Sequence, residues 1–149
     1  MNIKLVKKQI IGWREWVAFP ELGIEKIKAK IDTGARSSAL HAYNIETYKT
    51  RSGKLKVKFS VHPIQKNSKQ VIDCHANIID QRVIKSSSGQ KELRTTILTS
   101  LSMGIASWPI ELTLTNRDAM GFRLLIGRTA IERKFLVDPQ KSYLMVRNK

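Results

Sequence analysis

The sequence predicts a single, mainly β domain that spans residues 1–149. Apolar and polar residues alternate with a period of two in several short runs, which is typical of half-buried strands. Turn-forming residues separate these runs, at Ser52-Gly53, 65–69, Ser86 to Gly89, Asn116 to Asp118 and Asp138-Pro139. Hydrophobic residues make up 42% of the chain, which is enough for one packed core and too many for a disordered chain.

The expected strands follow one another along the chain. In the first, residues 26–31, three lysines alternate with Ile27, Ala29 and Ile31, and the strand runs directly into Asp32. The other expected strands are 54–62, 71–80, 108–116, 121–127 and, as a short candidate, 141–148. Two segments, 37–45 and 128–135, have a briefly helical pattern, and one short helix is expected in the C-terminal half.

The charge predicts a polyanionic partner without identifying it. Lys and Arg number 27 against 12 Asp and Glu, so the formal net charge is +15. RNA, ribosomes, acidic membranes and acidic peptides would all be attracted, and the alternative is a merely solvated surface. No apolar run approaches the roughly 20 residues of a membrane span. The N-terminus lacks a secretory pattern and the single Cys74 excludes an internal disulfide, so we expect a cytoplasmic protein that does not contact membranes.

Two short elements carry chemistry. Asp32 ends a strand, where a side chain emerges from a rigid scaffold, Thr33 offers a hydroxyl, and Gly34 allows another backbone or a substrate to approach closely. Late in the chain, apolar residues precede Gly127 and Arg128 and a short helical start. Asp-Thr-Gly alone also occurs in ordinary capped turns, but the two elements in this order are far more specific.

This pair resembles the retropepsin-like aspartic proteases. The closer resemblance is to the bacterial family labelled ATP-dependent zinc proteases, which includes RimB-type proteins, and it is carried by residues 10–42, 82–94 and 110–131. The resemblance implies a retropepsin-like acid-protease barrel. For RimB-type members it also implies removal of glutamates from the glutamylated tail of a small-subunit ribosomal protein, so ribosome association is expected.

Aspartic proteolysis needs two carboxylates that share one proton. Because this chain has one Asp-Thr-Gly, it predicts a symmetric homodimer in which Asp32 of each subunit meets its partner on the two-fold axis. By resemblance to the retropepsins, Thr33 is expected to hold the two turns together through hydroxyl–backbone hydrogen bonds. Gly34 and Ala35 would then surround the pair of acids.

The expected substrate contacts are mostly cationic. Arg36 stands where viral retropepsins usually carry an acid that pairs with the Arg of the Gly-Arg element, so Arg36 and Arg128 are predicted to bind a substrate carboxylate together. The alternative is that Arg36 faces solvent or pairs with a structural acid. That acid would be Glu111 or Asp118.

Other contacts follow from neighbouring turns. Segment 83–92 is predicted as a flap, with Lys85 adding positive charge, or as an ordinary hairpin. Arg117 either faces substrate or makes a salt bridge. Ala35 and Gly127 complete the expected substrate site.

No metal or other cofactor is expected. His41, His62, His75 and Cys74 form no zinc-binding motif, and there is no phosphate-binding loop. Cys74 and His75 are adjacent on a strand and should point to opposite faces. Two competing interpretations remain: a non-catalytic basic β domain that binds RNA or ribosomes, or a retropepsin-like receptor for acidic peptides. In the first, Trp13, Trp16 and Trp108 would stack on bases.

Overall fold

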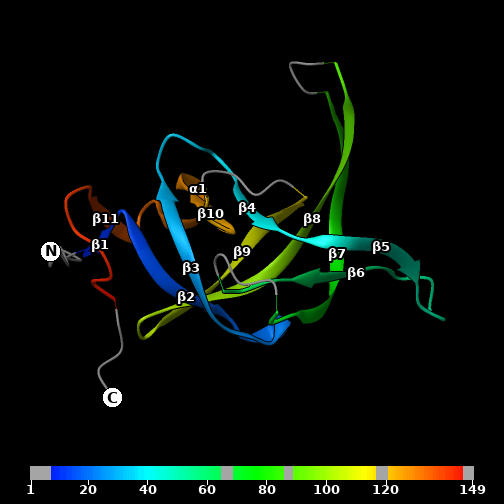
Figure 1. Ribbon diagram of the computed structural model, residues 1–149, viewed down its shortest axis with the longest axis horizontal. Coiled ribbons are helices and arrows are strands. Elements are labelled where there is room, and N and C mark those ends of the chain that lie inside the picture. Colours follow the sequence, from blue (N-terminus) through cyan, green and yellow to red (C-terminus); the bar gives the residue numbers. More distant parts are fainter. Residues whose placement is uncertain (1–7, 65–68, 86–88, 117–120, 146–149) are drawn as a thin grey trace, which may run out of the picture.

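The computed structural model describes residues 8–64, 69–85, 89–116 and 121–145, except the side chains of residues 84 and 85. Its elements are, in order, β1 (Gln9–Gly12), β2 (Arg14–Phe19), the 3-10 helix η1 (Pro20–Leu22), β3 (Ile24–Asp32), β4 (Ser38–His41), β5 (Tyr43–Lys49), β6 (Leu55–Val61), β7 (Ile72–Lys85), β8 (Lys91–Met103), β9 (Ala106–Thr115), β10 (Leu124–Gly127), α1 (Arg128–Ile131) and β11 (Phe135–Asp138) (Figure 1). The mainly β fold with a short α-helix in the C-terminal half is confirmed. None of the helices in these described ranges is long and apolar enough to span a membrane.

The central sheet closes on itself. Nine strands follow the order β2-β3-β10-β4-β9-β8-β7-β6-β5, and an additional pairing between β2 and β8 joins Ala18 to Ser102. This pairing closes the strands from β2 to β8 into a barrel, which removes most exposed strand edges. β7, β6 and β5 continue the sheet outside the barrel, and β1 pairs separately with β11 at one side (Figure 1). The barrel that the resemblance implied is therefore present.

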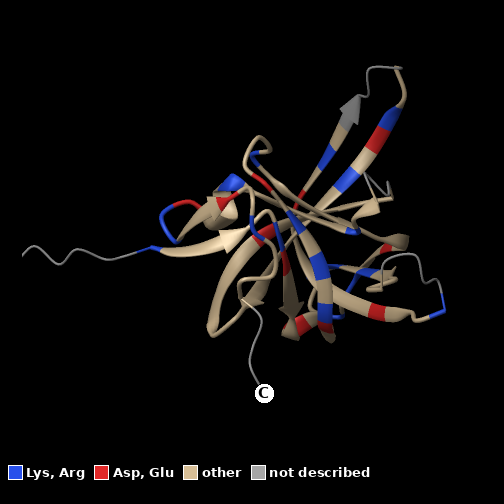
Figure 2. Ribbon diagram, turned by 60° about the vertical axis from the view of Figure 1, so that its left-hand side comes forward, with Lys and Arg blue, Asp and Glu red and all other residues tan. Residues whose placement is uncertain are grey.

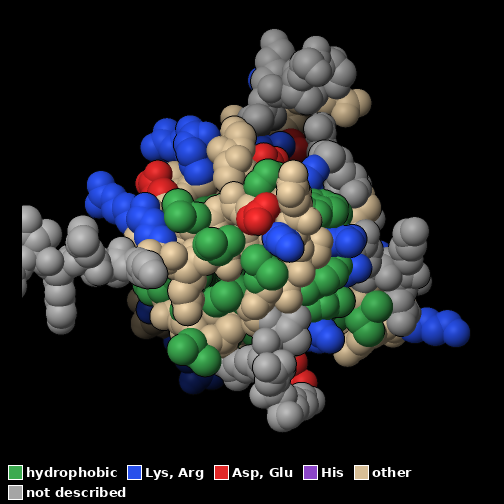
Figure 3. All heavy atoms as spheres, turned by 90° about the vertical axis from the view of Figure 1, so that its left-hand side faces the viewer, with side chains coloured by type: hydrophobic (Ala, Val, Ile, Leu, Met, Phe, Trp, Pro, Cys, Tyr) green, Lys and Arg blue, Asp and Glu red, His purple; other side chains and the backbone are tan. Residues whose placement is uncertain are grey.

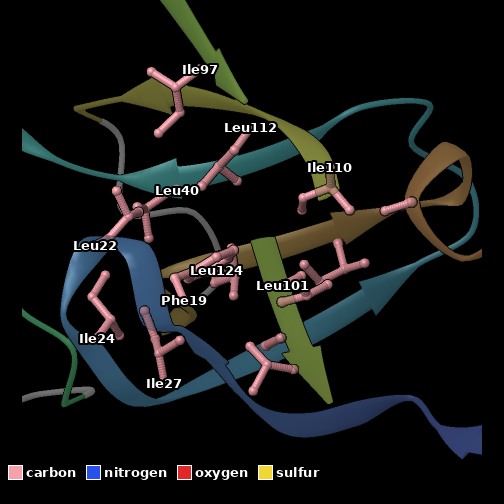
Figure 4. Packing of buried hydrophobic residues seen from close by; sticks show 14 of the residues in the cluster. Phe19, Leu22, Ile24, Ile27, Leu40, Ile97, Leu101, Ile110, Leu112 and Leu124 are labelled. Atoms are coloured by element: carbon pink, nitrogen blue, oxygen red, sulfur yellow. The ribbon is translucent and has the colours of Figure 1, made fainter. Parts of the chain in front are cut away.

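Alternating residues of the strands fill the barrel. Ile27, Ala29 and Ile31 of β3 are buried, as their period-two pattern predicted, while the intervening lysines lie on the outer side. Figure 4 shows Phe19, Leu40, Leu101, Leu112 and Leu124, which come from five different strands, packed in one cluster. The core forms directly beneath the C-terminal end of β3 and so provides a rigid base for Asp32.

The briefly helical pattern at 37–45 does not produce a helix. This segment forms β4 and the start of β5, because β4 is inserted between β10 and β9 and gains hydrogen bonds on both sides. These non-local pairings override the local helical pattern. A left-handed residue, Asn44 with φ 52°, lies near the start of β5.

The expected C-terminal strand is also wrong over residues 141–145, and residues 146–148 lie outside the described ranges. Instead, the buried carboxylate of Glu15 binds this segment. Its Oε2 accepts hydrogen bonds from the main-chain N–H groups of Gly12 (2.7 Å) and Leu144 (2.9 Å), and its Oε1 accepts one from Met145 (2.9 Å). These bonds add to two main-chain hydrogen bonds, from Trp13 N–H to the Lys141 carbonyl (2.9 Å) and from Tyr143 N–H to the Arg14 carbonyl (3.0 Å), so the segment is anchored without forming a strand.

Candidate active site

Asp32 is the last residue of β3, and its side chain closes the turn that follows. Its Oδ1 accepts hydrogen bonds from the N–H groups of Gly34 (3.1 Å) and Ala35 (3.2 Å). These bonds are characteristic of an Asx turn and fix one carboxylate oxygen. The other oxygen, Oδ2, has no hydrogen-bond partner within the described ranges. Asp32 is half-exposed, so Oδ2 is available to a water or to a second carboxylate.

Hydrogen bonds from the start of α1 hold the chain that follows the Asp32 turn. β10 runs parallel to β3 and places Gly127 opposite Asp32. The N–H of Arg128 donates to the carbonyl of Ala35 (2.8 Å). Thr129 donates to the carbonyl of Arg36 through its N–H (3.3 Å) and through its Oγ1 (2.7 Å). Three hydrogen bonds therefore hold the chain just after the Asp-Thr-Gly turn, across more than 90 residues of sequence.

Gly127 explains why the Asp-Thr-Gly turn and the Gly-Arg element occur together. A Cβ at this position would lie 2.5 Å from the carbonyl oxygen of Ser37 and 2.8 Å from that of Arg36, so only glycine lets the two main chains approach. Its N–H donates to the Oγ of Ser38 (3.0 Å). Gly127 is buried by these contacts. Gly127 thus supports the turn by packing against it, and its contact with a substrate stays a prediction.

The opposite side of the turn is open. Thr33, Gly34 and Arg36 are exposed, and Ala35 is half-exposed. Among the described residues, a Cβ at Gly34 would meet only Asp32 Oδ1, at 3.4 Å, so none of these residues requires a glycine there. The exposed edge of the turn is the surface on which another protein chain or a substrate would have to lie.

The two arginines lie beside this surface. Arg128 Nη1 is 3.4 Å from the carbonyl of Gly34, and the carbonyl of Arg36 is bound to α1. Neither guanidinium forms an ion pair within the described ranges, so the pairing of Arg36 with Glu111 is not formed, and Asp118 lies outside these ranges. The main chains at the two arginines lie close together, and no acid among the described residues pairs with either side chain.

A family model described as the retropepsin-like aspartic endopeptidase RimB matches residues 10–148. The chain belongs to this RimB-like family. The match includes the Asp32 turn and its Gly127 support, so the family covers the whole site. The resemblance to RimB-type proteins is confirmed. The description of the family model does not include the label of ATP-dependent zinc protease.

Curated relatives of this RimB-like chain carry a different name. A probable alpha-L-glutamate ligase from Shewanella pealeana is 49% identical over 138 residues, which is 93% of this chain and 30% of that protein. The proteins of the same name from Desulfotalea psychrophila and Parasynechococcus marenigrum are 49% and 44% identical, over 90% and 93% of this chain and 29% and 30% of their own lengths. The chain thus spans under a third of the curated relatives that it matches.

A solved structure supports the fold of the RimB-like chain. A protein of unknown function from Legionella pneumophila superposes with a TM-score of 0.76 at 26% sequence identity. The similarity covers 94% of this chain and 100% of that one. The closed barrel and its side pair are therefore a shared architecture and not a local coincidence.

The candidate metal ligands of the RimB-like chain are scattered. In the described ranges, no three His, Cys, Asp or Glu side chains gather as a metal site. Cys74 is buried, and its Sγ donates to the carbonyl of Leu22 (3.4 Å), whereas His75 is exposed and hydrogen-bonds with Tyr48 (3.0 Å). Their opposite orientation is confirmed. Burial, with a smaller contribution from Asp73, raises the pKa of Cys74 to about 12, so the thiol is neutral.

Two expected site residues cannot be placed. The side chain of Lys85 and the whole of Arg117 lie outside what the structure describes, as does the tip of the predicted flap at residues 86–88. The strands of that hairpin, β7 and β8, do pair, and they extend from the barrel as an arm (Figure 1). Sequence reasoning missed Ser38 and Thr129, because a lone hydroxyl after a turn or a Gly-Arg gives no pattern of its own.

Proposed function

We propose that the protein is an aspartic peptidase whose active site is completed by the Asp32 turns of two identical chains. The observation that carries this proposal is the state of Asp32. One oxygen is fixed by main-chain N–H groups, and the other has no hydrogen-bond partner among the described residues. The turn is bound to the start of α1 on one side and is exposed on the other. Such a carboxylate is positioned to work with a second one brought from outside the chain.

The chemistry follows from one proton shared by two acids. The ionised carboxylate removes a proton from a water molecule, whose oxygen attacks the carbonyl carbon of the scissile bond. The protonated carboxylate donates its proton to the carbonyl oxygen. The resulting tetrahedral intermediate collapses when the leaving nitrogen gains a proton from the dyad, and the C–N bond breaks. Two like charges about 3 Å apart cannot both ionise, which keeps one proton on the pair.

An apolar face supports the dimer. Ile10 and Leu136 are register partners in the β1–β11 pair, and they are 53% and 54% exposed. The side of the molecule that carries β1 and β11 faces the viewer in Figure 3, where several hydrophobic side chains lie near one another with acidic and basic ones among them. Homodimer interfaces are richer in apolar side chains than the rest of a protein surface. We propose that this face packs against a second copy.

The proposed substrate is an acidic, glutamate-rich peptide, such as the glutamylated tail of a ribosomal protein. The net charge of +15 and the two arginines beside Asp32, which lack ion pairs in the described ranges, favour a polyanion. The relatives from Shewanella pealeana and Desulfotalea psychrophila are named probable alpha-L-glutamate ligases, which supports a substrate that contains glutamate. We propose that the protein acts in the cytoplasm and associates there with the ribosome.

Asp32→Asn tests the catalytic proposal, because the amide keeps the shape of the turn and cannot hold the shared proton. The variant should lose at least about a thousandfold in cleavage of a glutamate-extended peptide, a loss of about 4 kcal/mol in transition-state stabilisation. Its melting temperature and its dimeric mass in solution should match those of the wild type. Retained cleavage, or a wild-type protein that stays monomeric while it cleaves, would overturn the proposal. Tight, salt-dependent RNA binding without cleavage would favour the non-catalytic alternative.

A further inference from the structure

A row of lysines leads along β3 to Asp32. Lys26, Lys28 and Lys30 are followed by Asp32 at the same spacing of two residues, so all four side chains share the outer face of the strand. Neighbouring members are about 6.6 Å apart along the strand. The opposite face is buried in the barrel core. Figure 2 shows basic residues over much of the fold and fewer acidic ones. The row on β3 differs from the rest because it ends at the proposed catalytic carboxylate.

Aromatic rings contact Lys26 and Lys28 of this row and the neighbouring Arg14. The Nζ atoms of Lys26 and Lys28 lie 4.3 Å and 5.3 Å from the centroid of the Trp16 ring. Tyr143 stacks on Trp16, with centroids 5.9 Å apart and planes 21° from parallel. The guanidinium of Arg14 lies 5.0 Å from the ring of Tyr143. We call these five residues the cation–aromatic face.

Ring contacts position a cation without cancelling its charge. Arg14, Lys26 and Lys28 make no ion pair within the described ranges, so their charge is not neutralised by a carboxylate of this chain there. Because the side chains are already held, an anion that binds them would lose less conformational entropy than at freely moving lysines. The face therefore has the features of a prepared binding surface for carboxylates.

We propose that the cation–aromatic face binds the acidic part of the substrate on one side of the bond that is cleaved at Asp32. This inference rests on the proposed function and assigns the substrate class to a specific surface. Alternate residues of an extended glutamate chain repeat at about the same distance as the lysine positions, so carboxylates can meet the cations one by one. Lys28 precedes Asp32 by four residues, about 13 Å along the strand. The face would hold glutamates about four residues from the scissile bond.

The surroundings favour an acidic peptide held by its side chains. β3 is already paired with β2 and β10, so a substrate cannot join it as an added strand. Recognition must then come from charge across the face. RNA fits less well, because base stacking needs a free ring face and Trp16 is already in contact with Lys26 and Tyr143.

The test measures the binding of a fluorescein-labelled glutamate octamer to the full chain that carries Asp32→Asn, by fluorescence anisotropy. The double substitution Lys26→Glu/Lys28→Glu should weaken binding at least about tenfold. The neutral pair Lys26→Gln/Lys28→Gln should give a smaller loss. The matched control is Lys56→Glu/Lys58→Glu on β6, which makes the same charge change at the same spacing on another strand. The control should change affinity less than about twofold.

The outcomes separate the two proposals. Equal losses from both lysine pairs would mean that only net charge matters, and no loss from either pair would remove the face from substrate binding; both results overturn the inference. Tighter binding of an RNA oligonucleotide at the same lysines would also overturn it. If the wild type cleaves peptide and the substitutions at Lys26 and Lys28 leave octamer binding unchanged, the role of the cation–aromatic face is refuted and the catalytic proposal stands. If octamer binding depends on Lys26 and Lys28 but the wild type cleaves no peptide, the catalytic proposal is refuted and the role of the face stands.

Discussion

Gly127 provides the sharpest test of how the Asp32 turn is built. In Gly127→Ala the new methyl group would lie 2.5 Å from the carbonyl oxygen of Ser37 and 2.6 Å from its carbon. Both are main-chain atoms, so no side chain can rotate away and the 36–37 segment must move. Overpacking of this kind costs about 2 kcal/mol, and weakening one main-chain hydrogen bond to α1 adds about 1 kcal/mol. The total of about 3 kcal/mol should lower Tm by about 10 °C in a chain of this length.

Gly34→Ala is the matched control, because it makes the same chemical change in the same turn. Its methyl group would meet only Asp32 Oδ1 at 3.4 Å, an ordinary contact, so Tm should stay within about 2 °C of the wild type. Peptide cleavage should nevertheless fall at least about tenfold, since the methyl group would occupy the surface where the second turn or the substrate lies. The assay is thermal unfolding by circular dichroism at one fixed protein concentration, together with cleavage rates. Equal Tm values for Gly127→Ala and wild type would refute this account of the turn.

Two further substitutions test buried polar groups. Glu15→Gln replaces one of two accepting oxygens by an amide nitrogen, so at least one main-chain N–H loses its partner; stability should fall by about 2 kcal/mol and the amides of Leu144 and Met145 should exchange faster with deuterium. Unchanged exchange would contradict the role of Glu15. For Cys74, the unfolded thiol ionises near 9.0 and the buried one near 12, so the unfolded state binds fewer protons between these values and stability falls as pH rises. From about pH 8 to about pH 10 the wild type should lose about 1.4 kcal/mol more than Cys74→Ala in denaturant unfolding, and equal losses would rule out this thiol as the cause.

Three of the strands that the sequence predicts have a one-sided burial pattern. β3, β6 and β9 each alternate apolar and polar residues, and each has one face against the core. β4 escaped prediction because four residues with a helical pattern become a strand only through pairing with β9 and β10, which are far away in sequence. The C-terminal segment escaped for the opposite reason. Its alternation resembled a strand, but the segment makes only isolated main-chain bonds to Trp13 and Arg14, and the buried carboxylate of Glu15 binds its last N–H groups.

The site was predictable to the extent that its residue types are unusual. An Asp-Thr-Gly after an apolar strand and a later Gly-Arg identify the turn and its support by sequence alone. The sequence could not show that Gly127 is buried under residues 36 and 37, because that depends on a close approach of two main chains. Nor could it show that Trp16 contacts lysines of the neighbouring strand, since that contact depends on the register in which β2 pairs with β3.

The numbers of two sequence elements favour a half-site in each chain. A two-lobed enzyme in one chain would need a second Asp-Thr-Gly turn, and it would also need a second glycine to let the chain after that turn pack closely on its support. The sequence has one Asp-Thr-Gly, and Gly127-Arg128 is its only Gly-Arg pair. The glycine is required for packing and the aspartate for chemistry, so a sequence could contain either one without the other. Their equal number supports our proposal that each chain contributes one complete turn and that the second carboxylate comes from another copy.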